Sequence, residues 1–119
     1  MKSPVSAGEH ELLSFFGVPP NSLDADVPWV YNASTYEAVD SATHVSFTIS
    51  PSYKDVRILL THRGTLLYEL DAIDVDDVRY HCDKGRECLE VVVTKRNSIW
   101  LSLNPHIVIR QGMAANPAG

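Results

Sequence analysis

The chain has 119 residues, which is enough for one domain and too few for two of ordinary size. Apolar residues make up 45% of it, and no apolar run approaches the roughly 18 residues of a membrane-spanning helix. The formal net charge is −5, with scattered basic residues and clustered acidic ones, which disfavours binding to nucleic-acid phosphates. We therefore expect a single domain over residues 1–119 that binds neither nucleic acid nor membrane and carries no cofactor.

The N-terminal segment predicts an arm followed by one short helix. Residues 1–7 are expected to form the arm. Residues 1–13 have a single Lys and lack the apolar core of a secretory signal, so we expect a cytoplasmic protein. In residues 9–16, EHELLSFF, a helix would place Leu12, Leu13 and Phe16 on one face. Gly17 is a suitable C-cap, and two prolines follow it. A helix this short must dock on a larger element.

An aromatic segment follows the helix. Trp29, Tyr31 and Tyr36 lie within eight residues of one another. We expect them to cover one end of a sheet. The alternative is an exposed anchor for a partner, because Trp and Tyr are enriched at binding hot spots.

From His44 onward, apolar residues alternate with polar ones, which predicts a series of strands. The inward sets are Val45, Phe47 and Ile49; Val56, Ile58 and Leu60; Leu66, Tyr68 and Leu70; Val78, Tyr80 and Cys82; Leu89, Val91 and Val93; Ile99, Leu101 and Leu103; and Ile107 and Ile109. Connections of two to five residues require antiparallel neighbours. The predicted fold class is α+β, mainly β: an antiparallel meander sheet of six to seven strands, curved or half-barrel, with the short N-terminal helix packed on it. Residues 111–119 are expected to form a loosely held tail.

The alternation changes parity within the acidic run DAIDVDD. Ile73 and Val75 share one parity, and Val78 begins the other. A slip of one residue would send the apolar set to the wrong face, so Asp76 and Asp77 are predicted to lie at a bulge, bend or turn. This places the carboxylates at the edge of the sheet.

Metal and catalytic sites fit the sequence poorly. The acidic run lacks the central glycine that a calcium loop of the EF-hand type needs. His81 and Cys82 are adjacent, so a strand would point them to opposite faces, and Cys88 is too distant for the usual zinc spacing. We assign no metal ligand and no catalytic residue, and expect no enzymatic activity.

Two further residue types leave alternatives open. Cysteines in a cytosolic chain are expected to be thiols, but Cys82 and Cys88 flank a predicted hairpin turn, so a strained disulfide under oxidation stays open. Trp100 lies on the outer face by the alternation of Ile99 and Leu101. Either the N-terminal helix covers Trp100 or it is exposed for binding.

Five segments, ELLSFFG, PWVYN, FTISPSYKDVRILL, LLYELDAIDVDDVRY and LSLNP, carry a family resemblance. In this layout the chain resembles the small single-domain immunity proteins of bacterial toxin–immunity systems. The resemblance implies a cytoplasmic antidote that binds and neutralises a cognate toxin domain, a nuclease being one candidate, without catalysis of its own.

An acidic surface suits a toxin domain with a basic surface. The expected partner-binding residues are Asp71, Asp74, Asp76 and Asp77, with Glu69 and Asp83 nearby and Tyr80 and Trp100 as apolar anchors. The alternative function is a non-enzymatic interaction or scaffold domain of the β-meander type, for which a homodimer along an edge strand is one form. A small metal-dependent enzyme ranks third.

Overall fold

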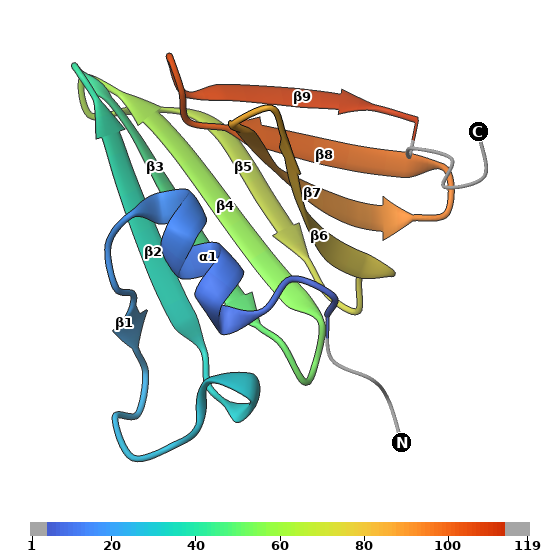
Figure 1. Ribbon diagram of the computed structural model, residues 1–119. Coiled ribbons are helices and arrows are strands. Elements are labelled where there is room, and N and C mark those ends of the chain that lie inside the picture. Colours follow the sequence, from blue (N-terminus) through green and yellow to red (C-terminus); the bar gives the residue numbers. More distant parts are fainter. Residues whose placement is uncertain (1–4, 114–119) are drawn as a thin grey trace.

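In the computed structural model, which describes residues 5–113, two antiparallel sheets enclose one core (Figure 1). The first sheet has the order β1–β2–β3–β4–β5, with bounds Asn21–Ser22, Ser34–Asp40, Thr43–Ser50, Asp55–His62 and Thr65–Ala72. The second has the order β6–β7–β8–β9, with bounds Asp77–Asp83, Arg86–Thr94, Asn97–Ser102 and Val108–Gly112. In the described part of the chain, no helix is long and apolar enough to cross a membrane.

The predicted class, mainly β with antiparallel neighbours and one N-terminal α-helix, is confirmed. The strand count differs, since the described residues form nine strands in two sheets rather than six to seven in one. The main addition is β2, whose inward side chains are Ser34, Tyr36 and the half-buried Ala38. A small polar residue and alanine on the inner face leave little apolar alternation to detect.

The core lies between the inner faces of the two sheets. The residues that the sequence pattern pointed inward are fully or almost fully buried on β3, β4, β7 and β8: Val45, Phe47, Ile49, Val56, Ile58, Leu89, Val91, Ile99 and Leu101. Residues of β5, including Tyr68 and Leu70, pack against this core but are only partly buried. The core is therefore densest at β3 and β4 and thinner toward β5.

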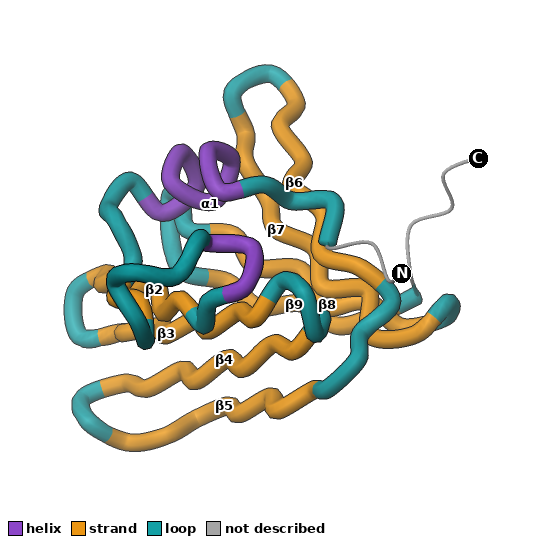
Figure 2. The backbone as a smooth tube through the Cα atoms, turned by 90° about the horizontal axis from the view of Figure 1, so that it is seen from below, coloured by secondary structure: helices purple, strands orange, loops and turns teal. Residues whose placement is uncertain are grey.

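The predicted helix is present as α1, Glu9–Phe16, and closes one side of the molecule between β2 and the β6–β7 hairpin (Figure 2). Glu11 accepts a hydrogen bond from the Gly8 N–H at 2.9 Å, which caps the first turn. Gly17 has φ +74° and donates its N–H to the Leu13 carbonyl, as expected of a C-cap.

The buried face of α1 differs from the prediction at one position. Leu12, Phe15 and Phe16 are buried, whereas Leu13 is 42% exposed. Phe16 stacks on Tyr36 with ring centroids 4.9 Å apart, which joins the helix to β2.

The aromatic segment forms a short 3₁₀ turn, η1 (Trp29–Tyr31), and then enters β2. Tyr36 is fully buried and accepts a hydrogen bond from the Trp29 indole N–H at 2.9 Å. Tyr31, in contrast, is 68% exposed. The expectation that all three rings cover the sheet therefore fails for Tyr31, because the 3₁₀ turn points its ring outward.

The change of parity marks the passage between the two sheets. β5 ends at Ala72 and β6 begins at Asp77, so residues 73–76 form the connection. The predicted bend is confirmed, and its cause is a change of sheet rather than a bulge within one.

The two ends of the described chain are held by the second sheet. Ala7 is fully buried and donates its N–H to the Val78 carbonyl at 2.8 Å, so the arm is held from residue 5 onward. Gln111 and Gly112 pair with β8, and β9 thus extends past the predicted strand end. The rest of the predicted tail, residues 114–119, lies outside the described residues.

Candidate functional site

Two of the predicted binding residues, Glu69 and Asp71, lie on β5. They alternate with Tyr68 and Leu70, which face the core, so both carboxylates point to the outer face of the sheet. Arg57 lies directly opposite Asp71 on β4 and reaches Glu69 at 3.3 Å. Both side chains of this ion pair are about half exposed, so it neutralises Glu69 only weakly.

The connection after β5 carries Asp74 and Asp76 on a well-fixed backbone. Asp74 adopts φ +52° and donates its N–H to the Asp55 carboxylate at 3.0 Å. Val75 is buried and donates its N–H to Lys54, and Asp76 donates its N–H to the Val92 carbonyl at 2.8 Å. These bonds hold the connection in place while Asp74 and Asp76 remain exposed.

We call Glu69, Asp71, Asp74 and Asp76 the acidic rim. All four are exposed and follow one another along β5 and the connection to β6. Because the supporting backbone is paired or hydrogen-bonded, the four carboxylates stand on an already ordered surface.

Asp77 has a different environment from the rim. Its side chain is 16% exposed and accepts hydrogen bonds from the Ser6 backbone N–H at 2.7 Å and the Ser6 hydroxyl at 2.5 Å. Burial opposes ionisation, but these bonds, together with those from the Val78 N–H and Arg79, outweigh it and lower the pKa of Asp77. The geometry makes Asp77 an anchor for the N-terminal arm.

Asp83 and Tyr80 are both separate from the rim. Asp83 is at the opposite end of β6, and Tyr80 is on the inner face of the second sheet. Asp83 is at the far end of β6, six residue steps and roughly 20 Å from Asp77. Tyr80 packs against the core and donates its hydroxyl to Glu87 at 2.6 Å, and Ser14 of α1 donates to the same carboxylate. The hydrogen bond to Glu87 raises the pKa of Tyr80 to about 12.

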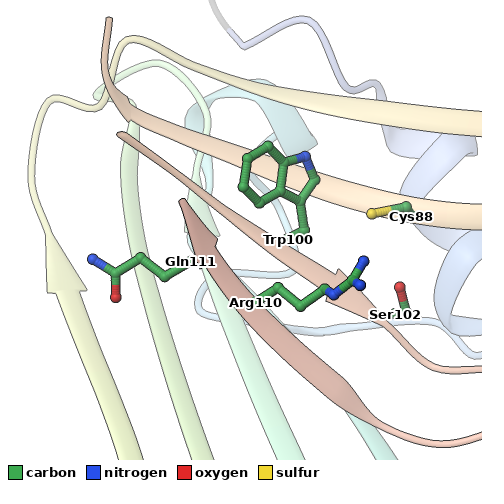
Figure 3. Close-up of a pocket in the computed structure, with 5 residues that line it drawn as sticks. All are labelled: Cys88, Trp100, Ser102, Arg110 and Gln111. Atoms are coloured by element: carbon green, nitrogen blue, oxygen red, sulfur yellow. The ribbon is translucent and has the colours of Figure 1, made fainter. Parts of the chain in front are cut away.

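Trp100 lies on the outer face of the second sheet. It lines a pocket of about 370 Å³ with Cys88, Ser102, Arg110 and Gln111 (Figure 3). Trp100 is half buried, and α1 packs on the opposite, inner side. Of the two sequence-based alternatives, coverage of Trp100 by the helix is therefore wrong.

Sequence reasoning missed a buried carboxylate beside Trp100. The inward positions of Leu89 and Val91 put Glu90 on the outward face of its strand, yet it is 0% exposed. It lies between Arg79 and Trp100 in register, accepts a hydrogen bond from Ser98 at 2.5 Å, and contacts His81 Nε2 at 2.8 Å. The outward-facing Val92 and Ser98 are also buried, so outward parity does not mean exposure in this part of the second sheet. The strand register shows what surrounds Glu90.

The register also decides the disulfide question. Cys82 is paired with Glu87, and Cys88 is paired with His81, so the two thiols point to opposite faces of the hairpin. Both cysteines are free. In residues 5–113, no group of three or more His, Cys, Asp or Glu side chains could hold a metal ion.

Comparison of structures finds a similar protein, whereas comparison of sequences finds none. No protein-family model matches the chain, and no curated protein matches it significantly. A solved structure does: a chain of the contact-dependent growth inhibition toxin–immunity protein complex from Klebsiella pneumoniae 342, with TM-score 0.78 and 22% identity. The two chains share one fold. The match covers 96% of this chain and 100% of that one, and it confirms at the level of fold the resemblance to toxin–immunity systems.

Proposed function

We propose that this chain is an immunity protein, a cytoplasmic inhibitor that binds and neutralises a cognate bacterial toxin domain without catalysis. The observation that carries the proposal is the likeness to a chain of a toxin–immunity complex over that chain's entire length. The likeness therefore includes the whole of that chain and not only one of its parts.

The charge of the chain supports the antidote role over the toxin role. A toxin that acts on nucleic acid needs basic side chains to neutralise phosphates. This chain instead has a net charge of −5 and exposes the acidic rim. We infer that the toxin domain is such an enzyme and that the rim occupies its basic cleft.

The rim is suited to both recognition and inhibition. Complementary charge steers association and raises the on-rate, and carboxylates can take the positions of substrate phosphates in a basic cleft. Asp83 lies at the far end of β6 and Tyr80 packs against the core, so a small interface centred on the rim does not include them. Within this proposal, Asp77 contributes by fixing the backbone next to Asp76.

Co-expression tests the proposal directly. The toxin domain encoded by the neighbouring open reading frame is induced in a sensitive bacterial strain with or without this chain. We expect growth only when this chain is present, and a one-to-one complex on co-purification. Growth arrest caused by this chain alone would assign it the toxin role, and a homodimer that ignores the toxin domain would support the scaffold alternative.

A further inference from the structure

β5 is the longest unpaired sheet edge in the described part of the chain. It has eight residues and pairs only with β4, and Figure 2 shows it as the outermost strand on its side of the molecule. The other edges are shorter or partly covered. β1 has two residues, β9 has five, and the N-terminal arm bonds to β6 through Ala7 and Ser6. An edge of this length presents a row of unpaired N–H and C=O groups.

The side chains of β5 give this edge two chemically different faces. On the inner face, Tyr68 and Leu70 are only partly buried. On the outer face, Glu69 and Asp71 are exposed and begin the acidic rim. At the hairpin end, the register shift leaves Leu67 62% exposed.

The side chains of a strand paired with β5 would contact β5 side chains on both faces of the sheet. Its alternate residues would lie beside Tyr68 and Leu70 on one side and beside Glu69 and Asp71 on the other. The side chains that fit are apolar on the first side and basic on the second. Addition of a strand to a free edge is an established mode of peptide recognition, in which the main chain supplies affinity and the alternate side chains supply specificity.

We propose that β5 accepts an extended strand of the toxin domain, with alternating apolar and basic residues, as a sixth strand of the first sheet. This inference rests on the proposed function and specifies how the partner is recognised. The acidic rim then continues the same interface, because residues 73–76 follow directly from the end of β5.

The same edge is unsuited to a second copy of this chain. Antiparallel pairing of β5 with itself would bring Glu69 and Asp71 of each copy together on one face. Like charges opposite each other destabilise a strand pair. Charge therefore favours a basic partner strand over self-association.

Amide hydrogen exchange, resolved by residue, tests the inference on the full chain and its complex with the neighbouring toxin domain. In the free protein, the amides of β5 that point to β4 should exchange slowly and the alternate ones quickly. In the complex, we expect the exchange rates of the quickly exchanging amides to fall at least about tenfold, so that every amide of β5 is protected.

The outcomes separate this inference from the proposed function. A stable complex in which the quick amides of β5 are unchanged would overturn strand addition and leave the proposed function standing. Failure of the toxin domain to bind at all would overturn both. Slow exchange throughout β5 of the isolated protein, with a dimer in sedimentation, would assign the edge to a second copy and contradict the inference.

A substitution pair gives an independent readout. Proline at whichever of Glu69 or Leu70 has the quick amide removes one outward N–H and leaves the pairing with β4 intact. We expect the affinity for the toxin domain to fall at least about tenfold relative to a chain of the same charge, with the melting temperature nearly unchanged. That reference chain is the wild type for Leu70→Pro and Glu69→Ala for Glu69→Pro. The matched control is proline at a quick-exchanging residue of β9, which should leave binding unchanged. Equal binding by both variants would contradict the inference.

Discussion

The carboxylate of Asp77 accepts hydrogen bonds from both the backbone N–H and the hydroxyl of Ser6, a residue 71 positions earlier in the chain. This contact holds the N-terminal arm against the edge of β6, where Ala7 adds a backbone bond to Val78. A residue that looked like one more member of an acidic run therefore organises the junction between the arm, the connection and the second sheet.

Replacing Asp77 with asparagine should destabilise the fold. The amide keeps one acceptor oxygen, so one bond from Ser6 is lost and the other loses its charge assistance. We expect the free energy of unfolding to fall by about 1–3 kcal/mol in urea titrations. The control is Asp76→Asn, at an exposed neighbour, with an expected change within about 0.5 kcal/mol. Similar losses in the two variants would contradict the anchoring role.

The same residue predicts a pH dependence. The folded-state pKa of Asp77 is lowered, so the unfolded state binds the proton more readily. The stabilisation is therefore complete above the unfolded pKa and is lost as the pH falls through the folded one. Unfolding titrations on the acid side of neutrality should show a steeper loss of stability for the wild type than for Asp77→Asn. Parallel curves would mean that Asp77 does not carry the dependence.

Glu90 should matter more for stability than any carboxylate of the rim. Glu90→Ala leaves the hydroxyl of the fully buried Ser98 without its acceptor, at a cost of about 1–3 kcal/mol. The comparison is Glu69→Ala, which removes a half-exposed ion pair worth at most about 1 kcal/mol. Thermal and urea unfolding measure both, and a loss for Glu69→Ala as large as that for Glu90→Ala would contradict the assignment.

The cysteines should not form an intrachain bridge. Mild oxidation is expected to leave the monomer mass unchanged, because Cys82 and Cys88 point to opposite faces of the hairpin. Alkylation should reach Cys82 first, since Cys82 is exposed and burial raises the pKa of the Cys88 thiol. Mass spectrometry reads both results, and a monomer two mass units lighter after oxidation would refute the register.

Local patterns in the sequence predicted much of the fold. The helix over residues 9–16 with its Gly17 cap follows from helical spacing and the prolines beyond. The strands around Phe47 and Ile58 follow from period-two alternation. These elements could be predicted because their signals lie within a few residues of one another.

The division into two sheets could not be predicted in the same way. The parity change near Asp76 indicates a bend, but a bulge within one sheet and a passage between two sheets produce the same local pattern. Which of them occurs depends on long-range pairing, such as that of Asp76 with Val92. The burial of Glu90 and the role of Asp77 have the same origin, since both depend on neighbours from distant strands or the arm.

The candidate site was predicted in part. Glu69, Asp71, Asp74 and Asp76 do lie along one edge, as the acidic run indicated. Asp83 does not join them. It is only six residues from Asp77 in the sequence, but the extended strand β6 holds the two residues at opposite ends.

Calorimetric titration of the toxin domain at low salt tests most directly whether the acidic rim binds it. The variant Asp71→Lys/Asp76→Lys reverses two rim charges. Its matched control, Asp26→Lys/Asp83→Lys, makes the same change in net charge at exposed residues. Asp26 follows β1 at the opposite edge of the first sheet, and Asp83 is at the far end of β6. We predict that the rim variant weakens binding at least about tenfold and that the control changes it less than about threefold. Equal effects of the two variants, or unchanged binding by the rim variant, would contradict binding by the rim.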